Sequence, residues 1–208
     1  MHFLKWLKKI FYQLLYKLYA SKGFQYQIYL AKGQAEKVFL STFKKIGNDV
    51  YFPNNRIVKN PQYISIGNCF FALQNLRLEA WDKYGSIEYA PEIIIGNNVC
   101  FNTDVHIGAI NKVFIGDNVL IASRVYISDH SHGEITAEAI KLPPSKRALF
   151  SKGPVIIENN VWIGEGVSIL PDVIIGVNSI IGANSVVTRS IPPNSVVVGN
   201  PARVIKTI

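Results

Sequence analysis

The hydrophobic residues between positions 157 and 191 recur at every sixth residue. The aliphatic positions are Ile157, Ile163, Ile169, Ile175, Ile181 and Val187. A second small or hydrophobic residue follows each by four positions, at Val161, Val167, Val173, Ser179, Ser185 and Ile191. A period of six fits neither a helix, with about 3.6 residues per turn, nor a strand that alternates at every second residue. It is typical of a hexapeptide repeat, in which each six forms a strand and a turn of a parallel β-helix.

Weaker repeats precede this stretch. They begin at Ile46 and are interrupted at residues 77–92, where Trp81-Asp82-Lys83-Tyr84-Gly85 predicts an excursion from the coil. Two steps span eight residues instead of six, from Val58 to Ile66 and from Ile107 to Ile115. Each of them follows two regular sixes, so we expect one corner of the prism to have a longer turn.

The pattern stops again in the second half of the chain. Residues 133–153 show no period of six, and we expect an insertion loop there, of the kind that often has a function. The repeats resume at Val155 and end at Pro192-Pro193. The segment from Val204 to Ile208 is expected to cap the last coil, since an open end would leave strand edges unpaired.

The first 20 residues show a helical period instead. Wound at about 100° per residue, one face of residues 2–20 is apolar and the other is basic. The apolar face comprises Leu4, Leu7, Phe11, Leu14, Leu15 and Leu18, and the polar face Lys5, Lys8, Lys9, Gln13 and Lys17. This amphipathic helix is too short and too charged to span a bilayer, and it lacks the features of a signal peptide. Two interpretations remain: it packs on the β-helix or a neighbouring subunit, or it lies on an anionic membrane.

The residues that follow this helix are ambiguous. Gly23 and Gly33 interrupt residues 21–45, of which 34–45 fit a short second helix. We therefore expect an N-terminal helical segment over residues 1–45 and a β-helix domain over residues 46–208.

Three segments in the second half of the chain carry a family resemblance. They are Val161-Trp162-Ile163-Gly164, Ile181-Gly182-Ala183-Asn184-Ser185-Val186-Val187 and Gly199-Asn200-Pro201-Ala202-Arg203-Val204-Ile205. With them, the chain resembles the hexapeptide-repeat acyltransferases, most of all the sugar O-acetyltransferases of bacterial surface polysaccharides, and more distantly the maltose and galactoside acetyltransferases. The resemblance implies an all-β, left-handed parallel β-helix with acetyl-CoA as donor, and a homotrimer with active sites at subunit interfaces.

Composition adds limits on partners. The 208 residues carry a net charge of +8, with 49% hydrophobic and 17% charged residues, which excludes a disordered chain and suggests anionic partners. The basic residues are spread along the chain and form no nucleic-acid motif, so we expect no nucleic-acid partner. Cys69 and Cys100 match no metal or redox spacing, and we expect two buried free thiols. A cytoplasmic protein fits, with a peripheral place at the inner face of the cell membrane as the second option.

One short segment has the composition of a catalytic site. Ser128-Asp129-His130-Ser131-His132-Gly133 places two histidines next to acidic residues at a corner of the coil. Histidine is the natural general base near neutral pH, and an alcohol that attacks a thioester needs one. In the maltose-type enzymes the catalytic histidine is the sixth residue of a hexapeptide, which corresponds here to His132, counted from Ile127. His130 would then lie behind the base or on the acceptor side. No ligand spacing supports a metal site.

The resemblance also implies binding residues. On the acceptor side it implies Asn102, with Asp104, Asp129 and His130 nearby, although Asn and Asp are also ordinary turn residues. On the donor side it implies a backbone N–H of Glu165 as oxyanion donor and a set of residues around acetyl-CoA. That set is Trp162, Gly164, Ala183, Thr188, Arg189, Arg203 and Lys206. The two arginines and the lysine would meet coenzyme phosphates.

These features predict acetyl transfer from acetyl-CoA to a hydroxyl group of a saccharide in capsule, O-antigen or related synthesis, directly and with a histidine base. Two alternatives remain. One is N-acetylation of a nucleotide-linked amino sugar, which would use the same frame. The other is a β-helix without catalysis that serves as a scaffold or binding module.

Overall fold

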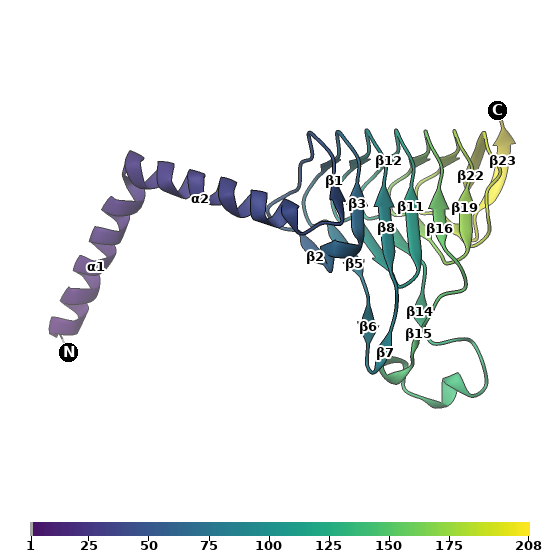
Figure 1. Ribbon diagram of the computed structural model, residues 1–208, viewed down its shortest axis with the longest axis horizontal. Helices are drawn as coiled ribbons and strands as arrows, with labels where there is room; N and C mark the ends of the chain where they lie inside the picture. The colour runs from purple at the N-terminus through teal and green to yellow at the C-terminus, as the bar shows by residue number, and fades with distance from the viewer. Residues whose placement is uncertain (1) are drawn as a thin grey trace. The chain divides into compact units, whose positions relative to one another are not determined.

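The computed structural model describes residues 2–208. The chain forms two compact units, one that ends at Thr42 and one that begins at Phe43. The first is helical and the second is a left-handed parallel β-helix (Figure 1).

The helical unit contains two α-helices. The first, α1 (His2–Ala20), has the bounds predicted from the amphipathic pattern. The second, α2 (Lys22–Ser41), is longer than the short helix expected near its end. Ser21 separates them and caps α2, because its Oγ accepts a hydrogen bond from the Phe24 N–H at 3.2 Å. Within residues 2–208, neither helix is long and apolar enough to cross a membrane.

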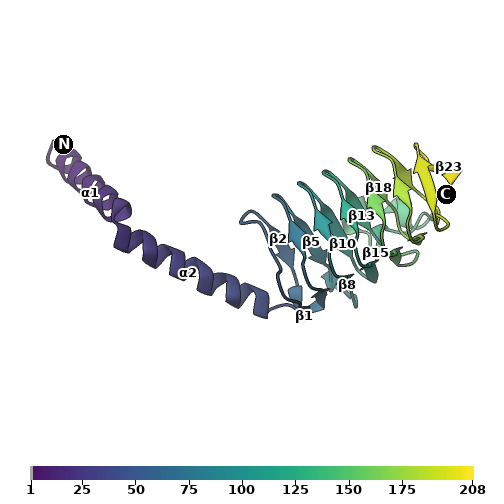
Figure 2. The same cartoon turned by 90° about the horizontal axis from the view of Figure 1, so that it is seen from above.

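The β-helix unit is a three-sided prism of parallel sheets, and its coils follow one another along the axis (Figure 2). Sheet A consists of β1 (Lys45–Ile46), β3 (Ile64–Ile66), β8 (Glu92–Ile95), β11 (Lys112–Ile115), β16 (Val155–Ile157) and β19 (Val173–Ile175). Sheet B consists of β4 (Phe71–Ala72), β9 (Cys100–Phe101), β12 (Leu120–Ile121), β17 (Trp162–Ile163), β20 (Ile180–Ile181), β22 (Ser195–Val198) and β23 (Arg203–Thr207). Sheet C consists of β2 (Ile57–Lys59), β5 (Arg77–Ala80), β10 (His106–Ala109), β13 (Tyr126–Ser128), β18 (Ser168–Ile169) and β21 (Val186–Val187).

The period of six corresponds to the core. Each predicted aliphatic position from Ile157 to Val187 is completely buried. Its neighbour one position earlier on the strand faces outward, as expected for a strand with one face on the core. The predicted closing segment is also present, since β23 pairs antiparallel with β22 at the C-terminal end of sheet B. These observations confirm the prediction of a hexapeptide β-helix with a closing segment.

The longer turn that the sequence predicts at one corner lies at the corner where the chain passes from sheet C to sheet A. Residues 60–63 form it in one coil and include the short 3₁₀ turn η1 (Pro61–Tyr63), and residues 110–111 form it in another. Both excursions leave the prism at this same corner (Figure 1). The first is the antiparallel hairpin of β6 (Lys83–Tyr84) and β7 (Ile87–Glu88). The second is the insertion loop, held at its base by antiparallel pairing of β14 (Ser131–His132) with β15 (Leu149–Phe150) and carrying the 3₁₀ turns η2 (Ala139–Lys141) and η3 (Pro144–Lys146).

One prediction about the cysteines is wrong. Both thiols are free, as expected, but neither is buried. Cys69 occupies a left-handed turn position with φ of 56°, which points its side chain to solvent. Cys100 lies half-buried on sheet B, where its backbone pairs with Leu120 of the next coil.

Candidate active site

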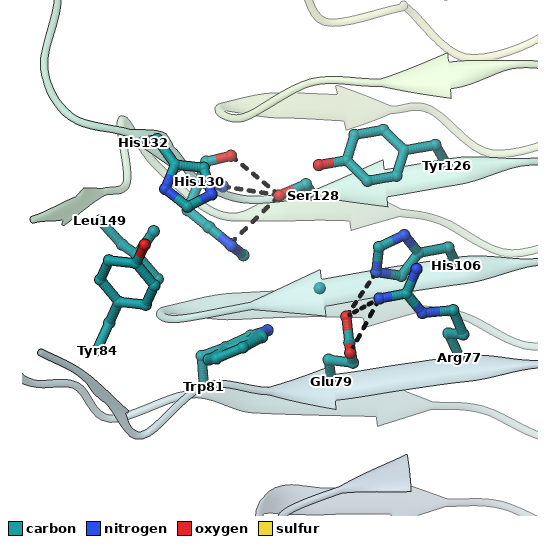
Figure 3. Close-up of a pocket in the computed structure, with 11 residues that line it drawn as sticks. Arg77, Glu79, Trp81, Tyr84, His106, Tyr126, Ser128, His130, His132 and Leu149 are labelled. Atoms are coloured by element: carbon teal, nitrogen blue, oxygen red, sulfur yellow. Dashed lines mark hydrogen bonds and ion pairs between the residues drawn. The ribbon is translucent and has the colours of Figure 1, made fainter. Parts of the chain in front are cut away.

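The corner between sheets C and A holds a cavity of about 220 Å³ between the two excursions. Its lining comes from three successive coils and from both excursions (Figure 3). The lining residues are Arg77, Glu79, Trp81, Tyr84, His106, Gly108, Tyr126, Ser128, His130, His132 and Leu149. Three of these, Ser128, His130 and His132, belong to the segment that the sequence analysis identified as catalytic.

His130 is paired with a buried carboxylate. Its Nδ1 lies 2.8 Å from Oδ1 of Asp129, whose side chain is completely buried, while the His130 side chain is 12% exposed. The ionised carboxylate can only accept, so Nδ1 donates and carries the proton of the neutral imidazole. Nε2 is then unprotonated and able to accept a proton. This pairing gives His130 the arrangement of a general base oriented by a carboxylate.

Asp129 is held in place by the preceding coil. Its Oδ2 accepts hydrogen bonds from the backbone N–H groups of Asn111 at 2.8 Å and Ile110 at 3.2 Å. Its Oδ1 also accepts from the Ile110 N–H, at 3.0 Å. A buried charge is tolerated only when such partners replace water. The long corner turn therefore provides the donors that fix the carboxylate behind His130.

Gly108 leaves room for the imidazole. A Cβ atom at this position would lie 3.2 Å from Cε1 of His130, closer than most Cβ contacts. The absence of a side chain lets the ring lie against the backbone of β10. Ser128 adds a further contact, since its Oγ accepts from the His130 N–H at 3.2 Å and lies 3.3 Å from Nδ1. The ring is thus confined on several sides.

His132 has a different setting. It lies on β14, outside the coil, and its residue is exposed. Its ring makes an edge contact with Tyr84 of the hairpin, with centroids 5.4 Å apart. No carboxylate pairs with it among residues 2–208. The register count that favoured His132 as the base stays a prediction, whereas the observed geometry favours His130.

Three charged or polar side chains form the opposite wall of the cavity (Figure 3). Glu79 accepts a hydrogen bond from His106 Nε2 at 2.8 Å and from Arg77 Nη2 at 3.0 and 3.1 Å. Burial alone would raise the pKa of Glu79, but the hydrogen bonds from Arg77 and His106 outweigh it and lower the pKa. The pKa of His106 is lowered chiefly by burial, and the Arg77 charge adds to this against the pull of Glu79. We therefore assign an ionised Glu79 and a neutral His106 that donates its Nε2–H.

The lowered pKa of His106 predicts a pH-dependent loss of stability. Below about pH 6.5, the unfolded chain takes up a proton on this histidine before the folded chain does, so acidification favours unfolding. His106→Gln keeps an N–H donor for Glu79 and cannot titrate. Urea unfolding at about pH 7.5 and 5.5 should show that the unmodified protein loses more stability on acidification than His106→Gln. Equal losses would contradict the assignment of a neutral His106.

Aromatic side chains from the hairpin close the remaining side of the cavity. Trp81 lies where β5 leaves the coil, and Lys59 Nζ lies over its ring, 3.1 Å from the ring centroid. Tyr84 reaches the insertion loop, because its hydroxyl donates to the Ser145 carbonyl at 2.9 Å. Tyr89 does the same with the Leu149 carbonyl at 3.1 Å. The two excursions therefore support each other and form one wall.

A second hollow, of about 690 Å³, lies on the other side of His130, toward the later coils. It shares His130, His132, Ser128 and Tyr126 with the first cavity. The rest of its lining is Ser131, Gly133, Glu134, Ile135, Phe150, Lys152, Leu170, Pro171 and Thr188. The imidazole of His130 thus stands between a smaller polar and aromatic cavity and a larger open one. This is the place for a group that moves a proton between two substrates.

Most other predicted site residues lie elsewhere in the chain. Of the donor set, only Thr188 lines a hollow that contains His130. Trp162 is half-exposed on sheet B, and Arg203 and Lys206 lie on β23 at the end of that sheet. Arg189 follows β21 and is exposed.

The turn from sheet B to sheet C holds a further group of predicted residues. Gly164 is required there, because a Cβ would lie 2.7 Å from the Ala183 nitrogen. The Glu165 side chain pairs with Arg124. Asp104 has φ of 60° and accepts a hydrogen bond from Asn75 at 2.8 Å. It therefore serves as an ordinary turn residue, one of the two interpretations that the sequence left open. Asn102 lies half-buried beside it, and neither lines the cavities around His130.

The sequence analysis missed the polar and aromatic walls. Arg77 and Glu79 alternate along β5 and Trp81 follows it directly, and this period-two pattern could have marked the three as a row on one side of the chain. Their proximity to His130 depends on how β5, β10 and β13 stack across the hairpin that separates the first two, which no local pattern gives. Within residues 2–208, the structure contains no group of three or more side chains arranged to hold a metal ion.

Comparison with known proteins gives consistent matches. The model of the bacterial transferase hexapeptide (six repeats) matches residues 154–189. The chain is 40% identical over 167 residues to WbbJ of Escherichia coli K12, which is named for O-acetyl transfer in lipopolysaccharide biosynthesis. That match covers 76% of this chain and 81% of WbbJ.

Solved structures give the same picture. A maltose O-acetyltransferase from Clostridium difficile 630 is 34% identical, with a TM-score of 0.57, and the match covers 83% of this chain and 74% of that one. A galactoside acetyltransferase in complex with coenzyme A is 28% identical, with a TM-score of 0.53, and the match covers 94% of this chain and 78% of that one.

Proposed function

Because the chain belongs to the hexapeptide-repeat acetyltransferases and is an acetyl-CoA-dependent enzyme of the sugar O-acetyltransferase type, we propose that it acetylates a hydroxyl group of a surface saccharide, with His130 as general base. The observation that carries this proposal is the His130–Asp129 pair between two hollows. The smaller cavity would take the acceptor and the larger one the thioester end of acetyl-CoA.

The reaction follows from the protonation state of His130. Nε2 takes the proton of the acceptor hydroxyl while the oxygen attacks the thioester carbonyl carbon. The imidazolium that forms is stabilised by the Asp129 carboxylate, which stays ionised. The C–S bond of the tetrahedral intermediate then breaks, the thiolate of CoA takes the proton from Nε2, and an acetyl ester is released. This direct transfer leaves no acyl group on the protein.

The developing oxyanion needs a hydrogen-bond donor, and the donor proposed here, at Glu165, lines neither of the hollows around His130 in the same chain. The proposed donor, the Glu165 N–H, lies in the turn before β18, while His130 follows β13 at the opposite edge of sheet C. Within residues 2–208 this N–H has no backbone acceptor. A second copy that sets its B–C turn against the C–A corner of the first would supply it. A head-to-tail contact of this kind can close into a ring. Together with the trimer that the family resemblance implies, it leads us to infer a homotrimer with shared active sites.

Sheet B supports such an assembly. Large apolar side chains face outward in one register row of this sheet, at Tyr51, Phe71, Leu120 and Trp162, and each is at least 43% exposed. Cys100 occupies the row between Phe71 and Leu120. An exposed apolar row of this kind is typical of an interface. Trp162 is then positioned for both a subunit contact and the acetyl-CoA cleft. Gly164, Ala183, Thr188, Arg189, Arg203 and Lys206 complete the proposed donor site.

The acceptor cavity has the chemistry of a saccharide site. Trp81 and Tyr84 offer aromatic faces for the C–H surface of a sugar ring, and Glu79, His106 and Arg77 offer hydrogen bonds to hydroxyl groups (Figure 3). Arg77 could also hold an anionic substituent. The donor is a cytoplasmic metabolite, so we place the reaction in the cytoplasm, on a lipid-linked or nucleotide-linked saccharide.

We expect substitution of Trp81 and of Trp162 to affect the binding of different substrates. Trp81→Ala should raise the KM for the saccharide roughly tenfold, since about 50 Å² of apolar surface at about 25 cal/mol per Å² is lost. It should leave the KM for acetyl-CoA unchanged. Trp162→Ala is the matched control and should raise the KM for acetyl-CoA instead. Steady-state kinetics with each substrate varied in turn checks both. The reverse pattern would contradict the division into two hollows.

The reaction class is tested by release of CoA from acetyl-CoA against a panel of sugars, nucleotide sugars and extracted lipid-linked oligosaccharides. We expect release that depends on one class of saccharide and is saturable in it. Release that is the same without any saccharide would be hydrolysis and would contradict the proposal. Binding of CoA with no turnover on any member of the panel would favour a scaffold or binding module.

A further inference from the structure

The first helix, α1, presents an apolar face that no described part of its unit covers. Placed at about 100° per residue, its apolar positions form one arc of about 140° without a polar interruption. The arc contains Phe3, Leu4, Leu7, Ile10, Phe11, Leu14, Leu15 and Leu18. All of these except Ile10 are exposed, by 43–69% of their surface. A face of this size on a soluble helix requires an occupant.

The charges around this face indicate that its occupant is anionic. Lys8 and Lys17 lie at its two edges, and Lys5 and Lys9 lie on the opposite side. No aspartate or glutamate occurs before Glu36, so the helix carries positive charge without internal compensation. Trp6, Tyr12, Tyr16 and Tyr19 are exposed beside the lysines. An apolar face with basic edges and amphipathic aromatic side chains fits the boundary between lipid headgroups and acyl chains.

We propose that α1 lies in the plane of an anionic lipid surface, with its apolar arc among the acyl chains and its lysines at the phosphates. The proposal does not depend on the reaction at His130. It does give that reaction a location, because the enzyme would be held beside acceptors that are carried on lipids.

A second copy of the chain is the rival occupant. Leu4, Leu7, Phe11, Leu14 and Leu18 have the spacing of a coiled-coil seam. A seam, however, uses two positions in seven, whereas this arc also includes Phe3, Ile10 and Leu15. A helix of 19 residues also contains fewer than the three or four heptads of a stable coiled coil. Identical helices would further bring lysines together with no acidic partner. Charge and width therefore favour the lipid surface.

The test is co-sedimentation of the full chain with vesicles. We expect binding to vesicles of phosphatidylethanolamine and phosphatidylglycerol, weaker binding to phosphatidylcholine alone, and release as salt is raised. Leu7→Glu should weaken binding at least roughly tenfold, since a buried leucine is lost. Gln13→Glu is the matched control, because it makes the same charge change on the polar face of the same helix, and it should weaken binding no more than about fivefold.

A second variant isolates the electrostatic part. Lys5, Lys8 and Lys9 changed together to alanine should lower partitioning roughly a hundredfold, at about fivefold for each lysine. The same three changes at Lys22, Lys32 and Lys37 of α2 are the control and should have a smaller effect. Acetyl transfer to a soluble acceptor should be unchanged in all of these variants, which shows that the β-helix is intact.

Two results would overturn the proposal. One is a full chain that binds neither kind of vesicle, or whose Leu7→Glu and Gln13→Glu variants bind anionic vesicles equally well. The other is a change in oligomeric mass on Leu7→Glu, measured by light scattering, without vesicle binding by the unmodified protein. That second result would make another copy of the chain the occupant of the arc.

Discussion

Replacing His130 with alanine is expected to lower kcat for acetyl transfer by roughly 10²–10⁴-fold, because the acceptor hydroxyl loses the group that takes its proton. The KM for acetyl-CoA should change little, since the imidazole acts on the acceptor proton. The fold should be retained, because the ring lies at the cavity surface and its partner Asp129 keeps two backbone donors. Added imidazole should restore part of the activity if the loss is one of proton transfer.

His132→Ala is the matched control for this prediction. It removes an identical side chain two residues away. Among residues 2–208 that side chain has no carboxylate partner, and its ring lies against Tyr84. We expect a change in kcat of no more than about fivefold. If His132→Ala abolishes turnover and His130→Ala does not, the register counted from Ile127 identifies the base and our proposal for His130 fails.

Asp129→Asn is expected to reduce kcat by roughly 10²–10³-fold through the tautomer of His130. Every described partner of this side chain is a donor, namely the Ile110 and Asn111 N–H groups and His130 Nδ1. An asparagine offers only one acceptor oxygen. If its NH₂ group faces His130, Nδ1 must accept and Nε2 must carry the proton, so Nε2 can no longer act as a base. If the NH₂ group faces the backbone, two donors meet and the turn is strained.

A measurement of stability distinguishes loss of the correct His130 tautomer from a general loss of folded structure. Asp129→Asn should lower the free energy of unfolding by about 1–3 kcal/mol, the usual range for a buried group left without a suitable partner. Asp117→Asn is the control, because Asp117 also accepts a backbone N–H at a coil corner, from Asn97 at 2.6 Å, but lies outside both hollows. It should lose stability without loss of kcat. Retention of kcat within about threefold in Asp129→Asn would contradict the role of the carboxylate.

The fold could be predicted from the sequence because its rule is local. Each six residues repeat the same strand and turn. Ile157 and the aliphatic residues at every sixth position after it can therefore be recognised as core positions without knowledge of distant contacts. The two eight-residue steps also marked the correct corner. The second helix was harder, since Gly23 and Gly33 suggested breaks. In the structure, both positions face open space in α2, where glycine costs only about 1 kcal/mol of helix propensity.

Part of the candidate site could be identified from the sequence, for a physical reason. The segment that contains His130 and His132 was found because two histidines beside an aspartate are visible in the sequence. Counting on from Ile127, however, extends the repeat beyond the point where the chain leaves the coil. At Ser131 and His132 the backbone already pairs with β15, so the sixth position no longer has the place it would have in a regular coil.

The acceptor walls could not be predicted in this way. Glu79, His106 and His130 belong to three coils, of which the first two are separated by the β6–β7 hairpin. Their proximity arises from stacking of β5, β10 and β13 in sheet C, in which His106 pairs with Arg77 and Tyr126. Such contacts are set by the register of whole coils, and a single sequence does not reveal it.

The central claim is that an acetyl group moves from acetyl-CoA to a saccharide oxygen at the cavity beside His130. The most direct measurement is an NMR analysis of the product formed by the unmodified protein from acetyl-CoA carrying a ¹³C-labelled acetyl group and the saccharide that supports CoA release. The account predicts a labelled acetyl ester on a sugar hydroxyl, absent with His130→Ala. A labelled amide on a sugar nitrogen, or free labelled acetate as the only product, would contradict it.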